Sequence, residues 1–323
     1  MRPCLKIILA LFVVGMTTGN AALAQEYPTR PIRWIVLFPP GGGSDIVSRM
    51  LAQRMSPNLG QQIVVDNRTG ASGVIGSEII AKANPDGYTI GLIISSHAVN
   101  PALFKKLPYD SVRDFEPITL IGYGLFALVV HPSVPAKSLK DLIALAKSQP
   151  GKLNAAVAST GTVGHLALEQ MKTLYQLDIT SVLYKGAGPA VIDTLGGQVQ
   201  IMFASYPSVQ PFIKAGKLRA LAVTSAKRSA AAPELPTAAE LGFAGLDLSD
   251  WWGLVAPAET NKAIIRRLNA ETTKALAQPD IREKLVSMGA DVVGSSPEEF
   301  GTLIRTGIDR WGKIVRDAGI KPE

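Results

Sequence analysis

Phe38-Pro39-Pro40-Gly41-Gly42-Gly43-Ser44-Asp45 is the stretch that decides the fold of this 323-residue chain. It follows an apolar run at 32–37, which predicts a buried strand, and it precedes apolar residues at helical spacing over 46–55. Three glycines allow a tight turn and a close approach of the backbone to a ligand. We expect Ser44 or Asp45 to cap the helix. Free N–H groups at the helix start, with the macrodipole behind them, would then form an anion site.

The loop alone leaves two interpretations open. It lacks the Gly-Lys-Ser/Thr ending of a phosphate-binding loop and the G-x-G-x-x-G spacing of a dinucleotide site. A tight turn that packs a helix on a sheet explains the glycines as well as an anion site does.

The first 24 residues have the pattern of a secretory signal peptide. Arg2 and Lys6 form a basic beginning, an apolar stretch follows at 7–14, and Ala22-Leu23-Ala24 fits an A-x-A cleavage site. The apolar stretch is short for a membrane span, so a retained anchor is the less favoured alternative. We therefore expect an exported protein cleaved after Ala24. Cys4 is the only cysteine, so the exported chain would be stabilised by its core without disulfides.

Composition excludes some classes of partner. The formal net charge is +7, and removing Arg2 and Lys6 would lower it by two to +5. This balance could steer anions, although solubility is the favoured explanation. There is no long Lys/Arg block, so no nucleic-acid partner is expected. The histidines His97, His131 and His165 lie in separate segments, and neither a metal nor a cofactor is expected.

Short apolar runs alternate with helical patterns along the rest of the chain. Helix starts are predicted at Ser138, Thr237 and Ser296, the last with Pro297 at the first helical position and Glu299 at the third. The alternation predicts an α/β fold with largely parallel sheets and helices on both faces. The predicted strands are 32–37, 63–65, 89–94, 153–158, 181–184, 199–203 and 218–223.

Ligands of such sheets bind beyond the carboxyl ends of the strands. The loops at those ends are rich in Gly, Ser and Thr, and apart from Asp45 they contain no carboxylate, Lys or Arg. This lining predicts binding through backbone N–H groups, hydroxyls and water. The loop at 159–165 also opens a helix, so two helix starts could hold the two ends of a dicarboxylate. The expected cleft loops are 39–45, 70–73, 95–100, 159–165, 186–189 and 204–207.

Short motifs in a fixed order carry a family resemblance over essentially the whole exported chain. They are Tyr27-Pro28, Arg30-Pro31-Ile32-Arg33, the loop at 38–45, Val65-Asp66-Asn67-Arg68, Ala83-Asn84-Pro85-Asp86-Gly87-Tyr88-Thr89, Asn100-Pro101-Ala102-Leu103, Lys106-Leu107-Pro108-Tyr109-Asp110, Gly151-Lys152-Leu153-Asn154, Tyr184-Lys185-Gly186, the segment 215–224 and Trp252-Gly253-Leu254-Val255-Ala256-Pro257. On these motifs the chain resembles the Bug receptors, the substrate-binding proteins of tripartite tricarboxylate transporters.

The resemblance implies a two-lobed α/β fold of the type II periplasmic-binding-protein kind. Crossover strands would lie near 127–131 and 251–256. Lobe 1 would comprise 25–126 plus 252–323, and lobe 2 would comprise 127–251. Hinge closure of the lobes would enclose the ligand.

The resemblance also implies which residues bind the ligand. In the family the first glycine loop helps to hold a carboxylate, partly through water, and a Ser/Thr-Gly helix start contributes from the other lobe. The family pattern has Asp-Asn where this chain has Ala204-Ser205, which predicts a ligand without a positive charge. The candidate ligand-binding residues are Phe38, Gly42, Gly43, Ser44, Ser72, Gly73, Ser95, Ser96, Ser159, Thr162, Val163, Gly164, His165, Ala204 and Ser205.

Several of these assignments have alternatives. His165 could donate to a carboxylate or make a structural hydrogen bond. An indole of Trp251 or Trp252 could stack on an aromatic acid, although packing is the commoner role. Lys185 could neutralise an anion or face solvent.

The function implied is that of a monomeric periplasmic receptor without enzymatic activity. It would capture a di- or tricarboxylate or an aromatic acid such as terephthalate. It would deliver this acid to a permease with one large and one small subunit. Presentation to a membrane sensor is an alternative. An exported hydrolase is less favoured, because G-x-S-x-G, H-E-x-x-H and paired cleft carboxylates are missing.

Overall fold

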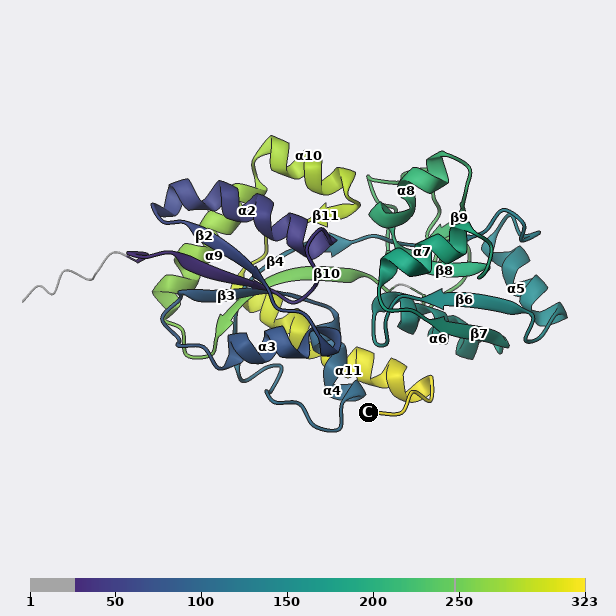
Figure 1. Ribbon diagram of the computed structural model, residues 1–323, viewed down its shortest axis with the longest axis horizontal. Coiled ribbons are helices and arrows are strands. Elements are labelled where there is room, and N and C mark those ends of the chain that lie inside the picture. The colour runs from purple at the N-terminus through teal and green to yellow at the C-terminus, as the bar shows by residue number, and fades with distance from the viewer. Residues whose placement is uncertain (1–26, 247, 323) are drawn as a thin grey trace, which may run out of the picture.

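The fold consists of two β-sheets, each with helices on both faces, placed side by side along the long axis of the molecule (Figure 1). The computed structural model describes residues 27–246 and 248–322, so the expected signal peptide lies outside them. Within that part of the chain, no helix combines the length and the apolar character that a membrane crossing needs.

The first sheet combines a parallel half with an antiparallel half. β1 pairs in parallel with β2 and β3, whereas β10 runs antiparallel between β3 and β4, and β11 is antiparallel to β4. The strand order is β11-β4-β10-β3-β1-β2. The strands are β1 (Ile32–Val36), β2 (Ile63–Asn67), β3 (Thr89–Ile94), β4 (Phe115–Gly124), β10 (Asp250–Pro257) and β11 (Ala290–Val292).

The second sheet has the same mixed character. β6 is parallel to β7 and β8, and β5 runs antiparallel between β8 and β9. The strand order is β7-β6-β8-β5-β9. The strands are β5 (Phe126–Val130), β6 (Leu153–Val157), β7 (Ile179–Leu183), β8 (Ile201–Ser205) and β9 (Arg219–Val223).

These sheets confirm the α/β class and all seven predicted strands, but the expectation of largely parallel sheets is wrong. Apolar periodicity shows that a strand is buried, and it does not show which way the strand runs. Strands β4, β5 and β10 run against their neighbours because the chain passes between the sheets there. The passages lie at 124–126, between β4 and β5, and just before β10.

Strand β1 shows why both faces of the first sheet carry helices. Its alternate side chains Ile32, Trp34 and Val36 are fully buried in one core, and Ile35 is fully buried in another. Helices α2, α9 and α10 cover the first face, while α3, α4 and α11 cover the second. Their bounds are α2 (Gly43–Leu59), α3 (Val74–Ala81), α4 (Ser96–Leu103), α9 (Lys262–Leu276), α10 (Pro279–Ser287) and α11 (Pro297–Asp317), and a short 3₁₀ turn, η2 (Ala71–Gly73), precedes α3.

Two of the three predicted helix starts are confirmed. The Ser138 hydroxyl accepts from the N–H of Asp141 at 3.1 Å, and Ser296 and Glu299 form a complete capping box at the start of α11. The second sheet is covered by α5 (Leu139–Ser148), α6 (Val163–Tyr175), α7 (Ala187–Leu195) and α8 (Tyr206–Lys214).

The helix predicted at Thr237 is wrong. Thr237 and Glu240 do make reciprocal capping hydrogen bonds, but only one turn follows. Gly242, at φ +84°, ends that turn, with Phe243 N–H donating to the carbonyl of Ala238. A C-terminal glycine motif thus stops the helix as soon as it starts.

The two sheets also touch through segments outside the crossing strands. The Ser72 hydroxyl donates to the carbonyl of Thr160 at 3.3 Å, and a Cβ on Gly161 would lie 2.1 Å from Leu103. Helix α11 reaches across to contact α6 (Figure 1). The lobes are therefore in contact along the side that carries α4.

Candidate functional site

The glycine loop begins α2 in a way that leaves amide groups free. The N-cap is Gly42, with an extended backbone and no side-chain cap, so the expectation of a Ser44 or Asp45 cap is wrong. The N–H groups of Gly43, Ser44 and Asp45 have no acceptor among the described residues. Gly41 has φ +80°, a conformation that favours glycine. The loop thus offers donors to an anion, as the sequence predicts.

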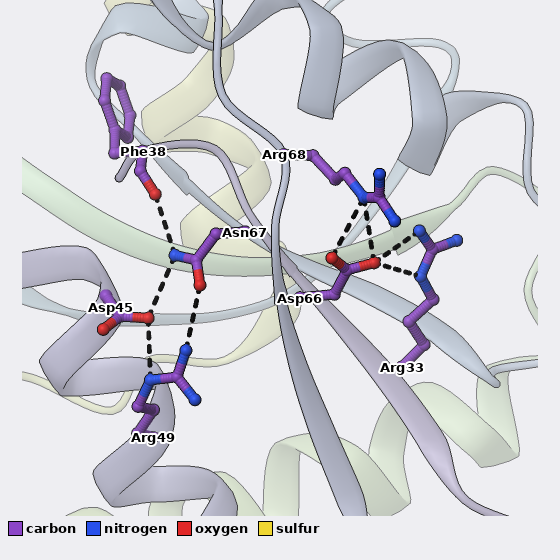
Figure 2. Close-up of polar contacts among 7 residues, drawn as sticks. All are labelled: Arg33, Phe38, Asp45, Arg49, Asp66, Asn67 and Arg68. Atoms are coloured by element: carbon purple, nitrogen blue, oxygen red, sulfur yellow. Dashed lines mark hydrogen bonds and ion pairs between the residues drawn. The ribbon is translucent and has the colours of Figure 1, made fainter. Parts of the chain in front are cut away.

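Asp45 stabilises the glycine loop through hydrogen bonds within the protein (Figure 2), and it does not line the cavity described below. Its Oδ2 accepts from the N–H of Gly41 at 2.9 Å, and its Oδ1 accepts from Arg49 and Asn67, each at 3.0 Å. Asn67 also donates to the carbonyl of Phe38 at 2.9 Å, which ties the end of β1 to the start of α2. Burial alone would raise the pKa of Asp45, but the hydrogen bonds from Arg49, Gly41 and Asn67 hold that pKa below its usual range.

Figure 2 also shows the carboxylate of Asp66, which pairs with two arginine side chains. Asp66 accepts from Arg33 at 2.6 and 2.9 Å and from Arg68 at 3.1 Å. These hydrogen bonds outweigh burial and lower the pKa of Asp66. The motif at 65–68 therefore stabilises the strand end behind the glycine loop.

The turn η2 brings Ser72 to the other lobe in a strained conformation. Ala71 and Ser72 have φ +45° and +52°, which side chains rarely adopt. The carbonyl of Ser72 accepts from Ser96 at 3.3 Å and from Asn100 at 3.4 Å. Gly73, at φ +90°, lies so close to Leu37 that a Cβ there would be 2.9 Å away.

Relieving this strain is expected to stabilise the protein. Ala71→Gly should raise the free energy of unfolding by roughly 0.5–1 kcal/mol, because glycine adopts positive φ without steric cost. Urea unfolding measures the change. Ala270→Gly, at an exposed helical position in α9, is the control and should destabilise by about 1 kcal/mol. A loss of stability in Ala71→Gly would contradict the prediction.

The start of α6 is held by its own side chains. Thr162 is the N-cap and accepts from the N–H of His165 at 3.4 Å, while His165 Nδ1 accepts from the N–H of Gly161 at 3.1 Å. This is the structural hydrogen bond considered for His165, and it places the imidazole proton on Nε2. Burial lowers the pKa of His165 and favours the neutral ring. Gly164 packs on β8, where a Cβ would lie 2.5 Å from the carbonyl oxygen of Phe203.

A cavity of about 420 Å³ lies between the lobes in front of the glycine loop. From the first lobe Gly41, Gly42 and Gly43 line it. From the second lobe the starts of α7 and α8 line it, with Ala187, Ser205 and Ser208. Helix α6 contributes no residue to this lining. Ile46, Pro207, Met288, the hinge residues Gly124, Leu125 and Phe126, and the β10 residues Asp250 and Trp252 complete the lining.

The start of α7 is therefore the second helix N-terminus at this cavity. Its N-cap is Gly186, at φ +121°, and the N–H groups of Ala187 and Gly188 have no acceptor in the described ranges. The sequence predicts the start of α6 at this place, whereas the lining of this cavity includes no residue of that start.

A smaller cavity of about 310 Å³ lies on the other side of the contact between Ser72 and Thr160. Ser72 and Ser159 line it, together with Lys321 near the end of the chain. Of the predicted site residues, the larger cavity thus contains Gly42, Gly43 and Ser205, and the smaller one contains Ser72 and Ser159. The other predicted residues line neither of these two cavities: Phe38, Ser44, Gly73, Ser95, Ser96, Thr162, Val163, Gly164, His165 and Ala204.

Ala204 is a specific correction. It is 1% exposed and packs in the core of the second lobe, beside Ala127. An aspartate introduced there would be buried without a partner.

Asp250 is the site residue that sequence reasoning missed. It lines the larger cavity from the first position of β10, and it lies outside every loop that the sequence predicts for the cleft. The larger cavity therefore contains a carboxylate that was not expected. Its neighbour in the lining, Trp252, lies against the glycine loop, 3.4 Å from a Cβ built on Gly43. No local signal marks Asp250, because the pairing of β10 with β3 brings it there.

Neither of these two cavities is lined by Trp251, Lys185 or His97. Trp251 packs edge-on against Phe300 at 5.4 Å, and Lys185 is exposed. Burial lowers the pKa of His97 to about 4, and its Nε2 is 2.9 Å from the carbonyl of Ser111. Residues 27–246 and 248–322 contain no cluster of His, Cys, Asp and Glu suited to a metal ion.

Comparison with known proteins gives consistent matches. A model of the tripartite tricarboxylate transporter family receptor matches residues 47–320. BugT of Bordetella pertussis is 38% identical over 319 residues, which cover 98% of each chain. The R. palustris protein Rpa4515, solved with adipate, is 36% identical, with a TM-score of 0.85 over 92% of this chain and 100% of that one. MatC of Rhodopseudomonas palustris, solved with bound malate, is 32% identical, with a TM-score of 0.81 over 90% of this chain and 100% of that one.

Proposed function

The chain belongs to the tripartite tricarboxylate transporter receptor family, among the Bug receptors, and we propose that it captures a small carboxylate between its lobes for a membrane permease. It is thus a periplasmic solute-binding receptor, a class that is not enzymatic. The proposal concerns the chemical class of the ligand, a carboxylate, and its delivery to a permease.

One observation carries the proposal. Gly43, at the start of α2, lines a cavity of about 420 Å³, and its N–H has no acceptor among residues 27–246 and 248–322. The opposite wall of the cavity includes the start of α7. Helix N-termini attract anions through free amides and the macrodipole. The volume lies within the range of about 300–1,000 Å³ usual for small-molecule sites. A dicarboxylate between the two helix starts would satisfy both.

Lobe closure follows from this arrangement. Gly43 belongs to the first lobe and Ala187 to the second, so one ligand reaches both only when the lobes meet. The polypeptide passes between the sheets at 124–126 and before β10, where bending would bring the lobes together. Relatives solved with adipate and malate support a carboxylate as the ligand. The family's description supports a tripartite permease as the partner.

Thermal melting against a panel of acids tests the proposal. The panel contains citrate, succinate, malate, adipate, aspartate, glutamate, terephthalate and protocatechuate, and the protein is unfolded and refolded first to remove any bound compound. An acid at a hundred times its dissociation constant should stabilise the protein by about 2.7 kcal/mol and be recovered unchanged. The absence of a shift with every acid would contradict a carboxylate receptor.

A further inference from the structure

Asp250 occupies a special position in the ligand cavity. It is the first residue of β10, and it faces the cavity together with Gly41, Gly42 and Gly43. No other residue in that lining is ionisable. The nearby carboxylate of Asp45 is already occupied by Arg49 and Asn67. Whatever charge the ligand carries, Asp250 is the ionisable side chain that meets it.

The hydrogen bonds of Asp250 are concentrated on one oxygen. Its Oδ1 accepts from the Ser95 hydroxyl at 2.5 Å, from the Ser95 N–H at 3.2 Å and from the Trp251 N–H at 2.9 Å. For Oδ2 the described chain provides no donor. Ser95 is itself 2% exposed, so the carboxylate is held in one orientation by a buried partner.

We propose that Asp250 Oδ2 accepts a hydrogen bond from the ligand, so that the receptor selects carboxylates that carry a hydroxyl or amino group over unsubstituted ones. This inference rests on the proposed function. A ligand that fills the cavity would displace water from this oxygen, and a ligand O–H or N–H would then replace the lost hydrogen bond. A ligand without such a group leaves Oδ2 unpaired.

The electrostatics of the site agree with this role. Burial raises the pKa of Asp250, although the hydrogen bonds from Ser95 and Trp251 oppose the rise. Among the described residues no charged side chain is a cause of the shift, so none of them supplies a cation that compensates this carboxylate. The Ala204-Ser205 pair predicts a ligand without a positive charge, because it provides no carboxylate. Asp250 supplies a carboxylate at the cavity, so the reason for that prediction no longer holds.

Two matched sets of acids test the inference by calorimetric titration at pH 7. The first set is succinate, malate and aspartate, which differ only in a hydrogen, hydroxyl or ammonium group at one carbon. The second is terephthalate and 2-hydroxyterephthalate. In the wild-type protein, at least one donor-bearing acid of a set should bind ten- to a hundredfold more tightly than its unsubstituted partner. Malate and aspartate distinguish a hydroxyl from an ammonium donor.

Asp250→Asn should remove this preference. The asparagine carbonyl can still accept from Ser95 and Trp251, while its amide group donates where Oδ2 accepted. The affinity ratio within each set should therefore fall to about threefold or less, and the unsubstituted acid should bind more tightly. Asp280→Asn, at an exposed carboxylate on α10, is the control and should leave the ratios unchanged.

Equal wild-type affinities within both sets would overturn the inference, and this measurement needs no variant, so misfolding of Asp250→Asn cannot obscure it. An unchanged ratio in folded Asp250→Asn would overturn it as well, while leaving a carboxylate receptor intact. A failure of all five acids, together with a flat melting panel, would overturn the proposed function and the inference with it.

Discussion

Replacing Gly43 with proline is expected to weaken carboxylate binding roughly ten- to a hundredfold while leaving α2 folded. Gly43 is the first residue of α2, where proline is favoured because its missing N–H has no helical partner. The preceding Gly42 has φ −75° and ψ 167°, the extended conformation that a following proline requires. The substitution therefore keeps the helix start, removes the N–H donor of Gly43 and places the proline ring in the space beside it. A hydrogen bond to a charged group contributes about 1.5–3 kcal/mol, which corresponds to the expected loss.

Gly43→Ala is the matched control for this experiment. It keeps the N–H and adds a Cβ that would lie 3.4 Å from Trp252, an ordinary van der Waals contact. Alanine should bind the acid found by the melting panel within about threefold of the wild type, and proline should not. Circular dichroism and urea unfolding verify that both variants fold. Equal losses in the two variants would show that the glycine provides space and that its N–H is not a ligand donor.

The parts of the site that sequence could predict are those encoded locally. The loop at 38–45 contains its own strand end, turn and helix start, so its free amides follow from neighbouring residues alone. The capping boxes at Ser138 and Ser296 are local in the same way. Thr237 shows the limit of this reasoning, because Gly242 ends the helix that the capping residues begin. Capping residues therefore predict a helix only where an uninterrupted helical pattern follows them.

The parts that sequence could not predict depend on which strands become neighbours. Asp250 reaches the cavity because β10 lies between β3 and β4, and Ser95 becomes its partner although 155 residues separate them. The replacement of α6 by α7 at the cavity depends likewise on how the two lobes meet. Ala204 follows a predicted strand end, yet it is buried in the core while the adjacent Ser205 lines the cavity. The position of a residue just beyond a strand end predicts that it lies near the cavity. Packing then decides which of these side chains line the cavity.

Asp45→Ala is expected to lower the free energy of unfolding by about 2–4 kcal/mol. The Asp45 side chain is only 5% exposed, and its removal would leave the N–H of Gly41 and the side chains of Asn67 and Arg49 without their acceptor. Losing a buried partner costs about 1–3 kcal/mol for each neutral group left unsatisfied, and Arg49, which is half exposed, adds less. Urea unfolding measures the loss. Asp66→Ala is the control, because that side chain is 24% exposed and pairs with two arginines that water can reach, so its loss should be about 1 kcal/mol.

Acid should narrow the stability difference between the wild type and Asp45→Ala. The pKa of Asp45 is lower in the folded protein than its ordinary value of 3.8, so its contribution to stability is complete above that pH. The contribution is then lost as the pH falls through the lower, folded pKa, because protonation removes the charge that holds Arg49 and the Gly41 amide. The stability gap should therefore be constant from pH 7 to about 5 and shrink below pH 3.8. A gap that stayed constant down to about pH 2 would mean that Asp45 supports the glycine loop through packing and neutral hydrogen bonds, and that its charge is dispensable.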